Sequence, residues 1–236
     1  MSLEQKINNY QTTQEAKALL RSTKIALLVG IAGAGKDTIK KRLLAEGGFS
    51  DIVSHTTRPP RSNNGMDEKD GIDYYFVDDQ IIEPMIDDQK FIEAKYVHGT
   101  VYGTSISELQ RAHDGNKVAV TDVDVQGVDE YKQLADETVA IFILPPNYST
   151  WRQRLEKRYH SASEFEAEWP KRRASAIREL ERALSVSYYH FLINDDIDRA
   201  VKVTKSIAMS DDSHNRQDDE ARLIARDLLD EIKLSN

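Results

Sequence analysis

The stretch KIALLVGIAGAGKDTIKKRL, residues 24–43, joins an apolar run to a glycine-rich segment, a lysine and a helical pattern. Ile25–Val29 is short, aliphatic and bounded by glycine, which is typical of a buried parallel strand. The glycines let backbone N–H groups curl around phosphate oxygens, and the helix that follows adds its positive dipole end. The stretch therefore predicts a phosphate-binding loop of the P-loop kind between a strand and a helix.

One position departs from the P-loop pattern G-x-x-x-x-G-K-[ST]. Gly30, Gly35 and Lys36 fit it, but Asp37 stands at the final position and Thr38 comes one place late. In P-loops the residue after the lysine usually offers a hydroxyl to Mg²⁺. The Asp37 carboxylate could ligate Mg²⁺ itself, point outward while Thr38 holds a phosphate, or repel the phosphates. The sequence leaves these three possibilities open.

Composition limits the class of protein. The chain has 236 residues, a formal net charge of −8 and no cysteine. It lacks a run near the ~20 apolar residues of a membrane-spanning helix, and the acidic balance argues against nucleic acid as a partner. Without cysteine there is no disulfide framework or thiolate zinc site, which fits a cytoplasmic protein. Arginines nevertheless cluster at Arg58 and Arg61 and along residues 152–182, which indicates a small polyanionic ligand.

Strand and helix patterns alternate on both sides of an inserted block. This order predicts an α/β fold with three layers, α/β/α, around a central parallel sheet. The inserted block, 56–109, reads as a mainly antiparallel subdomain, and 151–183 as a long arginine-rich helical region. The expected division is an N-terminal helical extension (1–23), a core (24–55, 110–150 and 184–209) and a C-terminal helix (210–236).

Five further motifs carry a family resemblance. They are VSHTTRPPR (53–61), GIDYYFV (71–77), FIEAKYVHGTVYGTS (91–105), TDVDVQGV (121–128) and FLINDDID (191–198). In this order and spacing, over residues 24–206, the chain resembles guanylate kinases. The resemblance implies transfer of a phosphoryl group from ATP to GMP, with Mg²⁺ accompanying ATP. It also implies that 56–109 binds GMP, that 151–183 forms a lid, and that the partners are these small molecules rather than nucleic acid or a membrane.

The resemblance assigns a clamp on the GMP phosphate. Two arginines supply bidentate charge-assisted bonds to a phosphate, and phenolic hydroxyls add neutral donors. Counting back from Gly71 places Glu68 at the family's acidic position in this loop. The alternatives are a solvated basic turn for the arginines and strand packing for the tyrosines. The clamp residues implied are Ser54, Arg58, Arg61, Tyr74 and Tyr102.

The same resemblance assigns the guanine contacts. Glu93 corresponds to the residue that faces guanine, where a carboxylate accepts from N1–H and the 2-amino group, which adenine does not offer. Thr104 would donate to O6, and Asp124 would add a second acceptor. Asp122, at the end of a strand, would organise Mg²⁺ or the acceptor phosphate. The alternatives are a surface position for Glu93 and bonds to loop amides for Asp122.

On the ATP side, the resemblance implies that Lys36, Arg154, Arg158 and Arg172 are catalytic. These cations would stabilise charge that spreads over the transferred group. The alternative for the arginines is an exposed helical face paired with Glu156, Glu164 and Glu166. Asn194 would contact the adenine or cap the following helix. The implied ATP-binding set is Gly30, Gly33, Ala34, Gly35, Lys36, Asp37, Thr38 and Asn194, with Asp37 or Thr38 at the metal.

Three features depart from the family's pattern. The loop reads Gly-Ile-Ala-Gly where the family usually has Gly-Pro-Ser-Gly, Asp37 replaces a small or hydroxyl residue, and the segment 61–71 is longer than usual. These departures sustain two rival functions. One is a related kinase that phosphorylates another acceptor, such as ribose bisphosphate. The phosphate-binding loop of that kinase also tends to read Gly-Lys-Asp. The other is a non-catalytic guanylate-kinase-like binding module. Whether the chain is a monomer or a homo-oligomer stays undecided.

Overall fold

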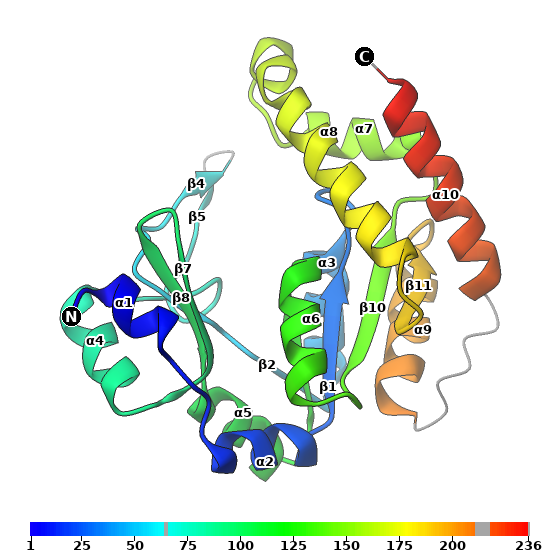
Figure 1. The fold of residues 1–236 in the computed structure, drawn as a ribbon. Coiled ribbons are helices and arrows are strands. Elements are labelled where there is room, and N and C mark those ends of the chain that lie inside the picture. The colour runs from blue at the N-terminus through cyan, green and yellow to red at the C-terminus, as the bar shows by residue number, and fades with distance from the viewer. Residues whose placement is uncertain (64–65, 211–217, 236) are drawn as a thin grey trace. The chain divides into compact units, whose positions relative to one another are not determined.

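The computed structural model describes residues 1–63, 66–210 and 218–235. The chain divides into two compact units (Figure 1). The first unit is formed by Met1–Thr23 and Ser50–Ala119, and the second by Lys24–Phe49 and Val120–Asn236.

The parallel sheet is the centre of the second unit. Its strand order is β11-β10-β1-β9-β2. Leu28 of β1 pairs with Ile141 of β10, which pairs in turn with His190 of β11. The strands are β1 (Ile25–Val29), β10 (Val139–Leu144), β11 (Tyr189–Ile193), β9 (Val118–Asp122) and β2 (Phe49–Asp51), and the boundary between the units falls within β9 and β2. All five residues of β1 are buried, as expected for a strand covered on both faces.

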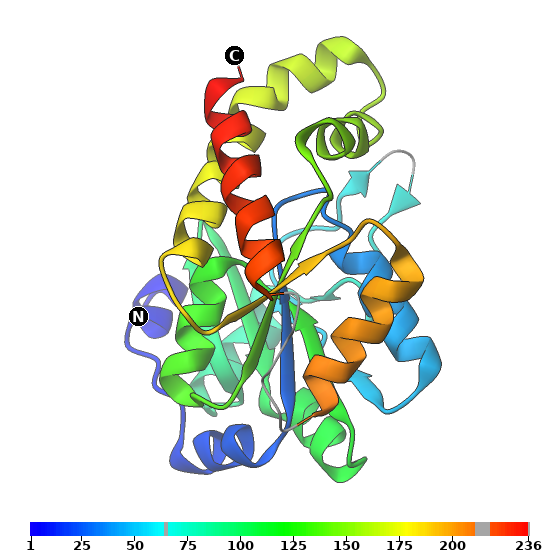
Figure 2. The same cartoon turned by 90° about the vertical axis from the view of Figure 1, so that its right-hand side faces the viewer.

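Helices cover both faces of this sheet. In Figure 2, α3 (Lys36–Glu46) and α9 (Ile197–Met209) lie on one side of it. The other side carries α6 (Val125–Leu134), α8 (Ala162–Leu184) and α10 (Asp218–Leu234). The remaining helix, α7 (Tyr148–Glu156), leads into α8. The α/β/α layering agrees with the fold class that the sequence predicts.

The first unit is built on a four-stranded sheet of order β6-β3-β8-β7. The β7–β8 and β3–β8 pairs are antiparallel, and the β3–β6 pair is parallel. The strands are β3 (His55–Thr56), β6 (Tyr75–Phe76), β7 (Phe91–Val97) and β8 (Thr100–Ser105). The helices are α1 (Leu3–Asn8), α2 (Gln14–Ser22), α4 (Asp79–Asp87) and α5 (Ile106–Asp114). Two short strands, β4 (Ser62–Asn63) and β5 (Met66–Asp67), pair antiparallel within the segment that is longer than usual in the family.

Two predicted boundaries need correction. Residues 1–23 are not a separate extension, because they form two helices that belong to the first unit. The compact unit around the inserted block also runs from Ser50 to Ala119 rather than over 56–109. Ile7 explains the first difference, since it is buried in one cluster with Phe91 and Val101. The start of the predicted C-terminal helix (210–236) falls largely on 211–217, outside the described residues, and α10 begins at Asp218.

None of the helices in the described part of the chain combines the length and the apolar character needed to cross a membrane.

Candidate active site

The glycine loop between β1 and α3 depends on residues without a Cβ atom. Gly30, Gly33 and Gly35 have φ angles of 139°, 84° and 100°. A Cβ added at Gly30 would lie 2.2 Å from the carbonyl oxygen of Ile143, and one at Gly35 would lie 2.2 Å from Nδ2 of Asn194. Both the backbone conformation and the close neighbours therefore require glycine at these two positions.

The loop ends at the N-terminus of α3. Gly35 is the N-cap residue, and no side chain caps this end of the helix. The N–H groups of the first helical turn are therefore directed outward, together with the positive end of the helix dipole. Lys36 follows at once, and its ammonium group donates a hydrogen bond of 2.5 Å to the carbonyl oxygen of Gly30. The N–H groups, the helix dipole and the Lys36 ammonium group together favour the binding of an anion at this point.

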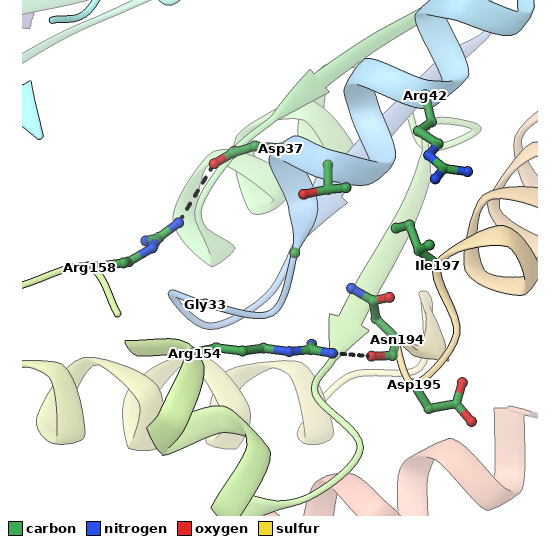
Figure 3. Close-up of a pocket in the computed structure, with 10 residues that line it drawn as sticks. Gly33, Asp37, Arg42, Arg154, Arg158, Asn194, Asp195 and Ile197 are labelled. Carbon is green, nitrogen blue, oxygen red and sulfur yellow. Dashed lines mark hydrogen bonds and ion pairs between the residues drawn. The ribbon is translucent and has the colours of Figure 1, made fainter. Parts of the chain in front are cut away.

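A pocket of about 510 Å³ opens beside this loop (Figure 3). It is lined by Gly33, Gly35, Asp37 and Thr38 from the loop and helix, and by Arg154, Arg158 and Asn194 from other elements. Nη2 of Arg154 donates to the carbonyl oxygen of Asn194 at 3.0 Å. Nη1 of Arg154 is buried with no hydrogen-bond partner in the described part of the chain.

Burial lowers the pKa of Arg154. A half-buried guanidinium that lacks a bond at one nitrogen is under-compensated, and a bound anion would supply both a charge and an acceptor. The electrostatics of the pocket thus favour a negatively charged ligand.

Asn194 directly follows β11 and hydrogen-bonds the glycine loop. Its side chain is buried and Nδ2 donates to the carbonyl oxygen of Ala34 at 2.8 Å, while its backbone N–H donates to Leu144. The alternative role as a helix cap is wrong, because Asp196 caps α9 by accepting from the N–H of Arg199. Contact with an adenine stays a prediction.

The other two predicted catalytic arginines lie on or next to α7 and α8. Arg158 lies 3.7 Å from Asp37, and Nε of Arg172 donates to the hydroxyl of Tyr159 at 2.8 Å. The three predicted acidic partners have other contacts. Glu156 and Glu166 pair with Arg152, and Glu164 accepts from the backbone of His160. The alternative of an arginine face paired with these acids is therefore wrong for the described contacts.

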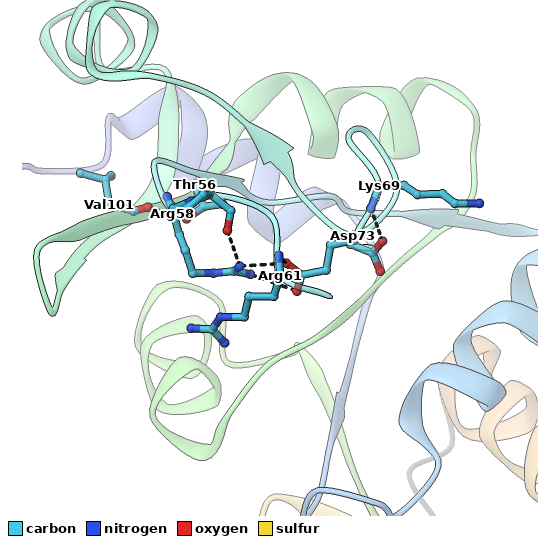
Figure 4. A network of polar contacts seen from close by, with 8 residues as sticks. Thr56, Arg58, Arg61, Lys69, Asp73 and Val101 are labelled. Atoms are coloured by element: carbon cyan, nitrogen blue, oxygen red, sulfur yellow. Dashed lines mark hydrogen bonds and ion pairs between the residues drawn. The ribbon is translucent and has the colours of Figure 1, made fainter. Parts of the chain in front are cut away.

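In the first unit, Arg58 forms a bidentate ion pair (Figure 4). Its two terminal nitrogens donate to the Glu68 carboxylate at 2.8 and 3.0 Å, and the same carboxylate accepts from the N–H of Arg61 at 2.8 Å. Arg58 is 9% exposed and its Nε is buried without a partner among the described residues. A solvated basic turn is therefore wrong for Arg58, although Arg61 is exposed.

The ion pair shifts the pKa values of both Arg58 and Glu68. The hydrogen bond to Glu68 raises the pKa of Arg58 against the opposing effect of burial. Burial would raise the pKa of the Glu68 carboxyl, but the bonds from Arg58 and from the Arg61 backbone lower it overall. Both groups are thus held in their charged forms at neutral pH.

Aromatic rings surround this ion pair. The Arg58 guanidinium lies over the Tyr74 ring at 5.3 Å and over the Phe76 ring at 5.7 Å. Tyr74 packs edge-on against Tyr102, with 6.0 Å between ring centroids. Four of the implied clamp residues, Arg58, Arg61, Tyr74 and Tyr102, therefore come from one neighbourhood of the first unit.

Two of the three implied guanine contacts, Glu93 and Thr104, meet on the same sheet. Glu93 of β7 lies directly opposite Thr104 of β8. The Thr104 hydroxyl is 3.2 Å from the Ser54 hydroxyl, and Thr104 is 3% exposed. Glu93 is therefore the strand neighbour of a residue whose hydroxyl lies beside that of Ser54, and a carboxylate with two hydroxyls is a set able to recognise the edge of a base.

The last two implied GMP contacts belong to the second unit. Asp122 accepts from the ammonium group of Lys40 at 3.2 Å, so the alternative of bonds to loop amides does not describe it. Asp124 is the N-cap of α6 and accepts from the N–H of Gly127 at 2.7 Å. Their roles toward GMP stay predictions.

Glu108 is a supporting residue that the sequence did not reveal. It is buried on α5 and accepts from the N–H of Val53 at 3.0 Å, from the Tyr75 hydroxyl at 3.2 Å and from Arg111 at 2.8 Å. It therefore fixes the chain just before Ser54. The spacing of Glu108 and Arg111 signals a helical ion pair, but not its burial.

The parallel sheet, the glycine loop with its lysine and the basic pocket define a P-loop protein of the nucleotide-kinase class. The sequence model of the guanylate kinase family matches residues 22–211, so the chain belongs to the guanylate kinase family. Guanylate kinase from Schizosaccharomyces pombe is 36% identical, covering 83% of this chain and 95% of its own. Guanylate kinase from Sus scrofa is also 36% identical, covering 83% of this chain and 96% of its own.

Guanylate kinase 1 from Oryza sativa is 35% identical over 82% of this chain, which spans 50% of that relative's length. The crystal structure of guanylate kinase from Anaplasma phagocytophilum superposes with a TM-score of 0.55 at 26% identity, covering 80% of this chain and 88% of that one. The comparisons confirm the predicted family, the α/β fold class and the phosphotransferase class.

Proposed function

We propose that this chain transfers the γ-phosphoryl group of ATP to GMP and releases ADP and GDP. Membership of the guanylate kinase family supports the reaction. The observation that carries the identity of the acceptor is the placement of Glu93 directly opposite Thr104, with the Ser54 hydroxyl 3.2 Å from that of Thr104.

The base would be selected by complementary hydrogen bonds. The Glu93 carboxylate would accept from N1–H and the 2-amino group of guanine, and the Thr104 hydroxyl would donate to O6. Adenine has no 2-amino group and no protonated N1, so it would leave the carboxylate unpaired. A site built to hydrogen-bond its substrate rejects such an analogue strongly.

The GMP phosphate would be held by the cluster around Arg58. The Nε of Arg58 and the exposed Arg61 offer donors that the bond to Glu68 does not use. Hydroxyls of Tyr74 and Tyr102 would add neutral donors without further charge. Glu68 limits the net positive charge of this cluster and keeps the guanidinium plane of Arg58 oriented.

The ATP phosphates would bind in the pocket of the second unit. The N–H groups of the loop would hold them, and Lys36 would exchange the Gly30 carbonyl for the β- and γ-phosphate oxygens. Arg154, whose Nη1 has no hydrogen-bond partner among the described residues, would neutralise charge on the transferred group, together with Arg158 and Arg172. The acceptor oxygen of GMP is already ionised, so alignment and electrostatics carry the reaction without a protein nucleophile.

The pocket also fits a magnesium ion carried by ATP. The described residues form no cluster of three or more acidic or histidine ligands, and Mg²⁺ in kinases typically relies on few side chains, phosphates and water. Asp37 and Thr38, both in the pocket lining, would supply oxygen ligands. When bound, Mg²⁺ would offset the charge of the β- and γ-phosphates. The proposal places the reaction in the cytoplasm.

A panel of acceptors tests the proposal. ADP release would be measured with ATP and Mg²⁺ and with GMP, dGMP, AMP or ribose bisphosphate as acceptor. We expect kcat/KM for GMP to exceed that for AMP by at least about 100-fold. Equal use of GMP and AMP, or a preference for the ribose phosphate, would overturn the proposed acceptor. Calorimetry with ATP and Mg²⁺ adds a separate check, since a binding module would show no measurable heat.

A further inference from the structure

The first 23 residues form part of the core of the first unit. Ile7 of α1 is buried in a cluster with Ile82 and Ile86 of α4, Phe91 of β7 and Val101 of β8. Lys6 pairs with Glu83 at 2.8 Å and with Asp87 at 2.5 Å. Figure 1 shows α1 lying against β7 and α4. The segment between α1 and α2 is therefore held against the sheet at both ends.

This segment bonds the outer edge of β7. The strand stands at one end of the sheet order, so within the described part of the chain its outward backbone groups have no neighbouring strand to bond. The Tyr10 hydroxyl accepts from the N–H of Phe91 at 2.9 Å and donates to the carbonyl oxygen of Phe91 at 2.5 Å. The Thr12 hydroxyl donates to the carbonyl oxygen of Ile92 at 2.5 Å. Two side chains thus take the place of a further strand.

The bonded residues immediately precede the proposed guanine-reading carboxylate. Phe91 pairs with Ser105 and Glu93 with Thr104, so the β7–β8 register shifts between Phe91 and Glu93. Such a shift places an extra residue on one strand and changes the direction of the side chains that follow. On the partner strand β8, Gly103 leaves room for the Phe91 ring, since a Cβ at this position would lie 2.8 Å from the ring.

The electrostatics agree with this proximity. Burial raises the pKa of the Tyr10 hydroxyl, the hydrogen bond that it accepts from the backbone N–H of Phe91 lowers it, and the charge of Glu93 raises it further. Tyr10 therefore lies within the electrostatic influence of Glu93 as well as bonding the strand that carries it.

We propose that Tyr10, together with Thr12, is a positioning residue that fixes the irregular start of β7 and thereby aims Glu93 at the guanine base. Both residues lie outside 22–211, the part of the chain that the family model matches. The inference rests on the proposed function, because it gives Glu93 the role of reading guanine. Selectivity for the base then depends on hydroxyls supplied from outside the matched region.

Hydroxyl deletions with matched controls test this inference. Tyr10→Phe removes both bonds to Phe91 and keeps the ring, and Thr12→Val removes the bond to Ile92, whereas Thr12→Ser retains a donor. Thr13→Ala is the control on the same segment, because the Thr13 hydroxyl caps α2 through the N–H of Ala16 and does not bond β7. Each variant would be assayed for kcat and KM with GMP, AMP and ATP, and for its melting temperature.

We expect Tyr10→Phe to raise KM for GMP about three- to tenfold and to lower the GMP-to-AMP ratio of kcat/KM by a similar factor. KM for ATP should not change. Thr12→Val should follow in the same direction, and Thr12→Ser should restore the wild-type values. Thr13→Ala should lower the melting temperature without changing the ratio.

Two results overturn the inference in different ways. If the wild-type chain prefers GMP but Tyr10→Phe lowers only the melting temperature, the segment supports the fold and does not aim Glu93. If the wild-type chain shows no preference for GMP over AMP, the proposed function itself fails, and the inference fails with it.

Discussion

The carboxylate of Asp37 and the guanidinium of Arg158 both line the pocket beside the glycine loop, with 3.7 Å between Oδ2 and Nη2. Both side chains are more than half exposed, at 61% and 52% respectively. An exposed pair of this kind contributes little stability and is easily exchanged for another ion. The unusual residue of the loop is therefore engaged with a proposed catalytic arginine, in a contact that phosphates and a metal can displace.

Replacing Asp37 tests its role toward magnesium. We expect Asp37→Ser to raise the half-saturating concentration of free Mg²⁺ about three- to tenfold, because a carboxylate ligand is replaced by a neutral hydroxyl. The measurement is initial rate against free Mg²⁺ at fixed ATP and GMP. Asp129→Ser is the control, since Asp129 pairs with Arg182 at 2.8 Å and neither residue is among those that line the pocket. An unchanged magnesium dependence would show that Asp37 is only a partner of Arg158.

The glycine loop between β1 and α3 could be predicted because its signal is local. Strand composition, glycine spacing and Lys36 all lie within 24–43, and the structure forms the loop and helix there. The direction of Asp37 could not be predicted, because its partner Arg158 is distant in sequence. The register that places Glu93 opposite Thr104 depends on an irregularity at Ile92, which alternation alone does not reveal.

The packing of the N-terminal segment was also not predictable from the sequence. Its apolar residues are sparse, so the pattern predicts a polar helical extension and does not indicate where that extension packs. Its packing instead depends on single contacts, such as Tyr10 with Phe91, 81 positions away in sequence. A hydroxyl that bonds one distant backbone group leaves no periodic pattern, so such contacts become visible only in three dimensions.

Glu93 carries the prediction on base selectivity. We expect Glu93→Gln to lower the GMP-to-AMP ratio of kcat/KM by about 10- to 100-fold, because an amide replaces one acceptor with a donor. The loss should appear mainly in KM for GMP. Asp114→Asn at the end of α5 is the control, since in the described part of the chain its carboxylate accepts from the exposed side chain of Gln110. Unchanged GMP kinetics in Glu93→Gln would mean that another residue reads the base.

The planar guanidinium of Arg58 leads to a prediction about binding of the GMP phosphate. Arg58→Lys removes the planar donor pair, so we expect KM for GMP to rise at least about tenfold while KM for ATP stays within about twofold. Arg111→Lys is a matched control, because Arg111 also pairs with a glutamate of the first unit, Glu108, at 2.8 Å. Steady-state kinetics with varied GMP provide the measurement. Equal effects of the two substitutions would indicate that Arg58 supports the fold and does not contact the phosphate.

His55 provides a prediction about pH. Burial lowers the pKa of its imidazole below the usual 6.5, although Glu108 and Asp70 partly oppose the shift, and the ring stacks on Tyr75 at 4.8 Å. The unfolded chain therefore takes up a proton first as pH falls, so stability present above pH 6.5 decreases as pH falls toward the folded-state pKa. We expect the melting temperature of the wild type to fall from pH 7.5 to 5.5 by about 2–4 °C more than that of His55→Gln. His190→Gln, in the second unit, separates this contribution from that of the other histidine whose pKa burial lowers. If the melting temperatures of the wild type and His55→Gln fall by equal amounts, protonation of His55 does not account for the loss of stability at acidic pH.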